Sequence, residues 1–399
     1  MQEFVDGLIA SGALPAGIPT WLLYAAAMLV FGSLVIFVFA LLVAGVTSWI
    51  ERRVWGRMQS RVGPNRVGPQ GVLQWLADGI KNLLKEDIIP TAADSKLFRL
   101  APYVVVAGFA ASFVVVPFAS KWIIADLNIG ILYLTAVTAL VVIGILMAGW
   151  ASNNKWSLLG GIRSAAQIVS YEIPAGLSLF PAVLLAGTLS MQGIIREQGW
   201  VPWDWYAFHN PFTFVAFVIF FVSALAEGNR TPFDLPEAET ELVAGFMTEY
   251  SGMRSLMFFL AEWGNLYVIG AVVTTLYLGG WQIPHVTDSV ILTQVLQFVV
   301  FFLKAYFWVF VAMWVRATLP RVRVDQLMVV CWKYLVPIAF INLAGTAVTM
   351  VVLHEVPVLA LPLRLGVTAV ALAIVVAFFR RVRYQLRRAR PELYLSPVI

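Results

Sequence analysis

Residues 129–151 read IGILYLTAVTALVVIGILMAGWA, a run of 23 residues without a charged side chain. At about 1.5 Å per residue, a helix of this length is long enough to cross a hydrocarbon core of about 30 Å. Further apolar segments lie at roughly 21–49, 100–120, 163–189, 211–226, 253–278, 289–314, 327–352 and 358–379. Because a lipid-exposed backbone has to satisfy its own hydrogen bonds, each should be helical. The sequence therefore predicts an all-α, polytopic membrane bundle of about nine transmembrane helices.

The composition agrees with a membrane protein and excludes several classes of site. Of 399 residues, 60% are hydrophobic and 12% are charged, whereas about a quarter are charged in soluble domains. One cysteine, Cys331, cannot hold an iron–sulfur cluster, and three scattered histidines do not suggest a metal site. No phosphate-binding glycine loop of a common type is present. We therefore expect neither a metal nor a redox cofactor bound by this chain alone.

The positive charges are distributed unevenly between the loops, and this predicts an orientation in the membrane. If loop 50–99 lies inside, that side receives 22 of the 27 Lys and Arg residues. The N-terminus would then lie outside and the C-terminus in the cytoplasm. In this interpretation residues 1–352 form a bundle of eight spans. Residues 353–399 add a ninth span and a tail with six arginines between 380 and 390.

The loop after the first span combines rigid turns with an amphipathic segment. Residues 51–71, ERRVWGRMQSRVGPNRVGPQG, contain Arg-Val-Gly-Pro twice, and glycine and proline at this density favour fixed turns. Residues 71–87 place apolar side chains on one helical face and Asp78, Lys81 and Lys85 largely on the other, which predicts an interfacial helix. The alternatives are a loop that only contacts lipid headgroups and a short helix packed within a folded loop.

Four ionisable residues interrupt the apolar spans: Glu172, Glu262, Lys304 and Lys333. Their separation from the charged span ends places them roughly 12–18 Å from the inner face, near the middle of a bilayer. A charge at this depth costs on the order of 3 kcal/mol and usually marks an ion or proton path. The alternative is two structural Glu–Lys ion pairs. Pro174 favours the path, because it bends the helix beside Glu172.

The segment AEGNRTPFDLPEAETELV (226–243) concentrates acidic residues beside the apolar spans. It contains Glu227, Asp234, Glu237, Glu239 and Glu241, with a single cation, Arg230. Asp234-Leu-Pro-Glu237 has the pattern of a helix start with Asp234 as N-cap. Crowded carboxylates raise one another's pKa, so such a cluster can exchange protons near neutral pH. The alternative is a solvated acidic loop.

Together these motifs resemble one family, a membrane subunit of proton-translocating NADH:quinone oxidoreductase, respiratory complex I. This subunit is designated H in bacteria, and its mitochondrial members are called subunit 1. The similarity extends from the first span to about residue 352. It is carried mainly by ERRVWGRMQSRVGPNRVGPQGVLQWLADGIKNLLKED, SYEIP and AEGNRTPFDLPEAETELVAGFMTEYSG. The resemblance implies a subunit that forms part of the quinone cavity and couples quinone reduction to proton translocation, without catalytic residues of its own.

The resemblance also implies roles for individual residues. Those of the quinone cavity would be Arg57, Arg61, Asp78, Glu227, Asp234, Glu237 and Glu239. Those of the proton path would be Glu172, Glu227, Glu249 and Glu262, to which the charges within the spans add Lys304 and Lys333.

The resemblance further implies the molecules with which the chain works. Quinone would be the substrate, while NADH, FMN and iron–sulfur clusters would be bound by partner subunits. The partners would be the peripheral quinone-site and iron–sulfur subunits, small membrane subunits, antiporter-like subunits and membrane lipids, but not nucleic acid.

Two features depart from the usual pattern of this family. Gly228 stands where members commonly carry threonine, and the chain continues into a ninth span. With 20 arginines against 7 lysines, the composition suggests a bacterial plasma-membrane protein rather than a mitochondrial one.

Two other functions remain open at this point. One is a membrane anchor of a related membrane-bound hydrogenase or other donor:quinone reductase, and the other is a free-standing secondary transporter. The complete quinone-type pattern of loops 51–87 and 227–252 favours complex I. The lack of a visible internal repeat argues against a transporter.

Overall fold

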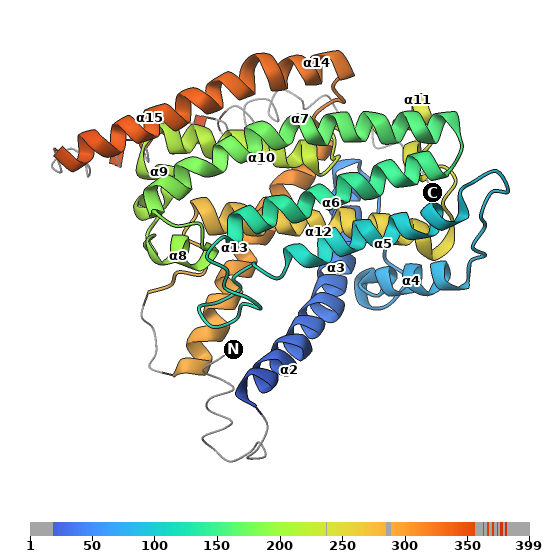
Figure 1. The fold of residues 1–399 in the computed structure, drawn as a ribbon, viewed down its shortest axis with the longest axis horizontal. Helices are drawn as coiled ribbons and strands as arrows, with labels where there is room; N and C mark the ends of the chain where they lie inside the picture. The colour runs from blue at the N-terminus through green and yellow to red at the C-terminus, as the bar shows by residue number, and fades with distance from the viewer. Residues whose placement is uncertain are drawn as a thin grey trace, which may run out of the picture.

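The computed structural model describes residues 19–236, 238–284 and 289–355, together with scattered positions between 362 and 380. These residues form helices and loops, with no strand among them, which confirms the predicted all-α fold. Long helices lie side by side across the molecule (Figure 1). The predicted ninth span, 358–379, and the basic tail fall largely outside the described residues.

Eight helical segments coincide with the first eight predicted spans. They are α2 (Thr20–Ser33) with η1 (Leu34–Ala40) and α3 (Leu41–Met58), α5 (Ser95–Ser112), α6 (Gly130–Ala151), α7 (Lys155–Ala186), α10 (Pro211–Glu227), α12 (Gly252–Tyr277), α13 (Val290–Thr318), and α14 (Val324–Val329) with η5 (Val330–Leu335) and α15 (Val336–Glu355). Five of these segments are long and apolar enough to cross a membrane: α6, α7, α12, α13 and the helix from Val324 to Leu353. The apolar α10 is shorter.

Several helix ends differ from the predicted spans. α3 runs on to Met58, and α7 already begins at Lys155, where the side chain of Asn154 caps the helix by accepting from the Trp156 amide. In α5 the predicted end at 120 was wrong, since the helix stops at Ser112. Phe113 and Phe118, which follow, are buried and turn the chain back into the core.

Short helices connect the long ones. They are η2 (Pro69–Gly71), α4 (Gln74–Leu84), α8 (Met191–Arg196), η3 (Pro202–Asp204), α9 (Tyr206–His209), α11 (Glu239–Leu242) and η4 (Gly245–Met247). α4 lies beside the bundle, against α3 and α12 (Figure 1).

The helix α12 forms the centre of the bundle. It packs against α3, α5, α10 and α13, and 61% of its most apolar window is buried, compared with 17% for the helix from Val324 to Leu353. On one side of α12, Tyr267 and Phe39 join an aromatic cluster with Phe113. Polar groups that α12 carries are therefore enclosed by the bundle, and all the cavities described below border this helix.

The loops predicted to lie inside meet at one end of the bundle, which we call the charged end. Asn153 donates to the carbonyl of Ala92 at 3.0 Å, and the Val322 amide donates to the carbonyl of Pro232 at 3.0 Å. Arg254, near the start of α12, pairs with Asp87 at 2.8 Å. Loops far apart in sequence thus form one continuous layer there.

Tight turns shape the segment between α3 and α4, as the repeated Gly-Pro pattern predicts. Gly68 and Gly71 have φ angles of +72° and +75°, a region that L side chains rarely adopt. A Cβ atom on Gly71 would lie only 2.3 Å from the carbonyl oxygen of Pro64. Gly71 therefore allows the chain to fold back on itself immediately before α4.

Replacing Gly71 with alanine should destabilise this segment. The positive φ alone should cost about 1–2 kcal/mol, and the clash with Pro64 should displace the turn further. The matched control is Gly79→Ala in α4, where an added Cβ meets no atom within 4 Å and should stabilise the helix by about 0.5–1 kcal/mol. Thermal unfolding of the purified assembly measures both. Equal unfolding midpoints for the two variants would contradict the assigned turn.

Candidate functional site

A cavity of about 790 Å³ lies between α3, α4 and α12; we call it the interfacial cavity. Its walls are mainly apolar, with Leu41 from α3, Leu76 and Ile80 from α4, and Leu256 and Leu260 from α12 among them. Arg52, Asp78 and Lys81 add a polar region to the lining. A volume of this size, lined by apolar side chains with a few polar groups, is typical of sites for small organic ligands.

The apolar face of α4 forms one wall of the interfacial cavity and is widely exposed. Leu76, Ile80 and Leu83 line the cavity and are 46%, 51% and 65% exposed, and Leu84 beside them is 83% exposed. The carboxylate of Asp78 points back toward α3. A helix with one exposed apolar face is suited to a membrane interface.

Asp78 fixes α4 to α3. Its carboxylate accepts hydrogen bonds from Arg52 at 2.5 Å and from Gln74 at 3.1 Å. Partial burial alone would raise the pKa of Asp78, but the hydrogen bonds from Arg52 and Gln74 and the charges of Arg52 and Lys81 lower it below its ordinary value. The carboxylate of Asp78 therefore favours its charged form and holds the Arg52 guanidinium at the polar region of the cavity.

Close packing also holds α4 in place. A Cβ on Gly45 of α3 would lie 2.6 Å from the ring of Trp75, so only glycine allows this ring to lie flat against α3.

A buried network of charges surrounds Glu51, the one acidic residue of α3. Glu51 Oε1 accepts from Arg230 at 2.9 Å and from Arg316, while Oε2 accepts from the Trp263 indole at 2.9 Å. Arg230 also pairs with Glu262 through its Nε at 3.0 Å. The side chain of Arg230 is 3% exposed. The single cation of the acidic segment is thus buried between two carboxylates from different helices.

This network connects two cavities. Trp263 lines the interfacial cavity, and its neighbour Glu262 lines a second, smaller cavity of about 70 Å³. Trp263, Glu51, Arg230 and Glu262 follow one another in direct contact. A change of charge at one end therefore reaches the other through buried contacts, where solvent screens little.

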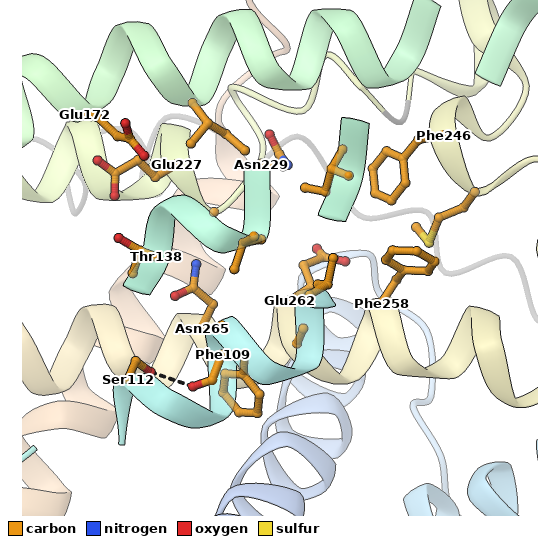
Figure 2. A pocket seen from close by; sticks show the side chains of 18 residues that line it. Phe109, Ser112, Thr138, Glu172, Glu227, Asn229, Phe246, Phe258, Glu262 and Asn265 are labelled. Atoms are coloured by element: carbon orange, nitrogen blue, oxygen red, sulfur yellow. Dashed lines mark hydrogen bonds between the residues drawn. The ribbon is translucent and has the colours of Figure 1, made fainter. Parts of the chain in front are cut away.

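Three carboxylates line the small cavity, which we call the carboxylate cavity: Glu172 from α7, Glu227 from the end of α10, and Glu262 from α12. Figure 2 shows the carboxylates of Glu172 and Glu227 pointing toward each other, with Asn265 between this pair and Glu262. Among the described residues no cation lies within ion-pair distance of Glu172 or Glu227, and one buried oxygen of Glu172 has no hydrogen-bond partner. The volume leaves room for a few water molecules.

A third cavity, of about 390 Å³, continues from Glu172, Glu227 and Asn265 between α6, α7, α10 and α12; we call it the lateral cavity. Two of its lining residues, Leu132 and Phe180, are 57% and 49% exposed on the side of the bundle. The facing pair of carboxylates therefore lies between the carboxylate cavity and a larger one that reaches the lateral surface.

The acidic segment is not a single cluster, contrary to what its sequence suggests. Asp234 is buried and pairs with Arg321 at 3.1 Å, so its predicted role as a helix N-cap is wrong; α11 begins five residues later, with Ala238 as N-cap. Burial raises the pKa of Asp234, although Arg321 opposes this rise. Glu241 pairs with Arg163 of α7 at 2.6 Å. The carboxylates separate because each has a different cation or cavity within reach.

Three further predicted site residues lie in or after this segment. Glu237 lies outside the described residues, as does the side chain of Glu239, the first residue of α11. Glu249 accepts a hydrogen bond from Asn154 at 2.6 Å and lines none of the three cavities.

Both lysines in the spans lie apart from the carboxylates, so the alternative of two Glu–Lys pairs is wrong. The ammonium of Lys304 donates to the carbonyls of Leu278 and Gly280, at 2.8 and 3.2 Å, just beyond the end of α12. Free carbonyls at a helix C-terminus attract a cation. Lys333 is exposed on η5. Neither lysine lines the cavities.

Arg57 and Arg61 are exposed at the charged end. Arg61 donates to Gln59 at 2.6 Å, and neither arginine lines any of the three cavities. The residues that face the interfacial cavity from this part of the chain are Arg52 and Asp78. Sequence reasoning missed Glu51, Trp263 and Arg316, although Glu51 directly precedes a pair of arginines at the end of the first span.

The family model for NADH dehydrogenase matches residues 31–347. The chain belongs to the NADH dehydrogenase family. Among its relatives, the H subunit of NADH-quinone oxidoreductase from Anaeromyxobacter dehalogenans is 54% identical over 361 residues, covering 87% of each chain. The corresponding protein of Chlorobium luteolum is 46% identical over 352 residues, or 86% of this chain and 92% of the relative. That of Chlorobaculum tepidum is 48% identical over 311 residues, or 75% and 86%.

The NADH dehydrogenase match includes every residue that lines the three cavities. Together with the long apolar helices, it identifies the chain as a multi-pass membrane subunit of NADH-quinone oxidoreductase, complex I.

Proposed function

We propose that the interfacial cavity forms part of the quinone-binding cavity of complex I. The observation that carries this proposal is a cavity of about 790 Å³ with apolar walls, one of which is the exposed apolar face of α4. A long-tailed quinone is dissolved in the lipid, so it can pass between α4 and α12 without crossing water. The leucines of α4 and α12 suit its tail, and Arg52, Asp78 and Lys81 offer polar contacts to a head group.

Reduction of the quinone is the reaction that we propose is coupled to proton movement. A quinone that accepts two electrons from the partner subunits takes up two protons to become a quinol. Charge therefore changes transiently near Arg52 and Trp263. Because Trp263 donates to Glu51, and Arg230 is shared between Glu51 and Glu262, such a change would alter how strongly Arg230 holds Glu262. This network is our proposed link between quinone chemistry and the carboxylate cavity.

Glu172, Glu227 and Glu262 are the proposed proton carriers. Glu172 and Glu227 face one another without a cation among the described residues, and carboxyl groups so placed can exchange a proton directly or through water. The lateral cavity continues from this pair to the side of the bundle, where a neighbouring antiporter-like or small membrane subunit would receive the proton. Lys304 is held by backbone carbonyls, and Lys333 is exposed, so neither has a place in this path.

The rest of the assembly supplies the redox centres. NADH, FMN and the iron–sulfur clusters would lie on peripheral subunits docked at the charged end, where Arg57 and Arg61 are exposed and would contact them. The unequal distribution of Lys and Arg supports a cytoplasmic position for this end in the plasma membrane of a bacterium, with the N-terminus on the other side.

Leu260→Trp tests the quinone assignment by filling part of the interfacial cavity. We expect the apparent KM for a long-tailed quinone to rise about tenfold, a loss of about 1.4 kcal/mol in binding. A short-tailed quinone analogue should be affected less, because it needs less of the apolar wall. NADH oxidation with an artificial acceptor that bypasses the quinone should persist in the same preparation.

The matched control is Leu303→Trp on α13, where the leucine is 63% exposed and lines none of the three cavities. It adds the same bulk to the lipid-facing surface and should leave the quinone KM unchanged. An unaltered KM for both variants would show that the quinone does not occupy the interfacial cavity.

A further inference from the structure

The exposed lysine on η5 is a charged group that the proposed function does not use. The helix formed by α14, η5 and α15 lies on the outside of the bundle, against α7 and α10 (Figure 1). Two hydrogen bonds join the inner face of this helix to α7. The carbonyl of Leu327 accepts from Tyr171 at 3.0 Å, and Cys331 donates to the carbonyl of Ser170 at 3.1 Å. Lys333 lies on the exposed side instead.

The surroundings of Lys333 are apolar and aromatic. Trp332 and Tyr334, its neighbours in sequence, are 51% and 52% exposed, and Val329 is 48% exposed. No described carboxylate lies within ion-pair distance of Lys333. The acidic residue closest in the helix is Asp325, eight positions earlier. The lysine is therefore a single cation on a surface that is otherwise suited to lipid chains.

The depth of Lys333 determines what can neutralise it. It lies nine residues beyond Val324, where α14 begins at the charged end, so its Cα is roughly 13 Å into the membrane. A cation there is costly, but a lysine can extend its stem along the helix and raise its ammonium toward the headgroup layer. A negative group at the headgroup level is therefore the complement that this surface requires.

We propose that Lys333 binds the phosphate of an anionic phospholipid in the leaflet at the charged end, with Trp332 and Tyr334 on either side of it around the helix. The acyl chains would cover Val329 and the apolar face beyond it, and the exposed Arg323 at the start of the helix would add to the attraction for negative lipid. The proposal is independent of the quinone and proton-path assignments, because Lys333 lines none of the cavities.

Lys333→Met tests this site in the purified complete assembly, because it removes the charge and keeps an apolar side chain of similar length. After detergent washing, lipid extraction and mass spectrometry should find less retained anionic phospholipid, by about one molecule per complex. The concentration of added phosphatidylglycerol that restores it should rise about fivefold. Lys333→Arg should behave as the unaltered protein.

The matched control is Lys155→Met at the same end of the bundle. Lys155 is also exposed beside a tryptophan, with its Nζ 5.3 Å from the Trp156 ring centroid, but it is the first residue of its helix and not embedded in an apolar surface. It should leave lipid retention unchanged. Unchanged retention in Lys333→Met, or equal restoration by phosphatidylcholine, would overturn the proposal. Loss of a partner subunit from Lys333→Met would overturn it too, because a protein carboxylate would then be the complement.

A second measurement needs no variant and serves if Lys333→Met does not assemble. The unaltered complex is treated with acetic anhydride in nanodiscs of phosphatidylglycerol and, separately, of phosphatidylcholine. Acetylation of Lys333 should be slower by several fold in phosphatidylglycerol, while Lys155 should react equally in both. Equal modification of Lys333 in the two lipids would contradict an anionic lipid site.

Discussion

Arg230→Met should be the most damaging single substitution at the charged end of the bundle. Arg230 is 3% exposed and holds both Glu51 and Glu262. Without it, Glu262 has no ion-pair partner among the described residues, and Glu51 keeps only Arg316. Removing one partner from a buried ion pair typically costs about 3–5 kcal/mol, because a buried charge is left uncompensated. We expect little of the variant subunit to be assembled, measured by quantitative immunoblotting of purified membranes.

The matched control for Arg230→Met is Arg163→Met. Arg163 also joins a helix to the acidic segment, through Glu241 at 2.6 Å, but Glu241 is 56% exposed. An exposed ion pair contributes about 0–1 kcal/mol, so the control should assemble normally.

Two further variants separate the charge of the network from its shape. Glu51→Gln with Glu262→Gln removes the carboxylates of α3 and α12 that Arg230 contacts, and should also be damaging because two buried ion pairs are lost. Adding both glutamines to Arg230→Met should restore part of the assembly, since no uncompensated charge then remains at these three positions. Normal assembly of Arg230→Met would show that the network does not hold the acidic segment to α3 and α12.

The double substitution Glu172→Gln, Glu227→Gln should leave the complex assembled and reduce proton pumping at least tenfold. Neither carboxylate has a cation partner among the described residues, so glutamine leaves no buried charge unpaired. Glutamine retains the shape and the hydrogen-bonding groups but cannot take up or release a proton. Quinone reduction and pumping would be measured together in reconstituted vesicles, with subunit composition checked in parallel.

The control and the conservative variants make this experiment specific to a proton path. Glu241→Gln removes a carboxylate from the same acidic segment but from an exposed pair, and pumping should be normal. Glu172→Asp and Glu227→Asp should retain part of the activity, because the titratable group survives with a shorter reach. Full pumping by the assembled double glutamine variant would end the assignment of both residues as proton carriers.

The structure also explains why Glu227, and not Glu262, is substituted together with Glu172. By sequence, Glu172 and Glu262 look alike, since each is a lone carboxylate in an apolar span. In the structure Glu262 pairs with Arg230, so Glu262→Gln would disturb the network as well as any proton transfer. Glu227, at the end of α10, is the better partner for Glu172 because the two share both the carboxylate cavity and the lateral cavity.

The sequence by itself determined the membrane bundle, eight of its helices and the amphipathic helix that follows the first of them. These features depend on the length and periodicity of apolar runs, which a lipid environment converts directly into helices. It also identified Gly-Pro turns after α3, because positive φ angles require glycine. Distinctive motifs in two loops and one helix were sufficient to indicate the family.

Only the tertiary structure decided which charges meet. Glu51, Arg230, Glu262 and Arg316 come from four separate parts of the chain, and no spacing in the sequence relates them. The same is true of the acidic segment. Arg230, Asp234 and Glu241 are close in sequence but pair with different parts of the chain. Lys304 and Glu262 lie at similar predicted depth, yet one binds helix-end carbonyls and the other an arginine. Charge pairing depends on distances of a few ångströms, and those distances are set by how the helices pack.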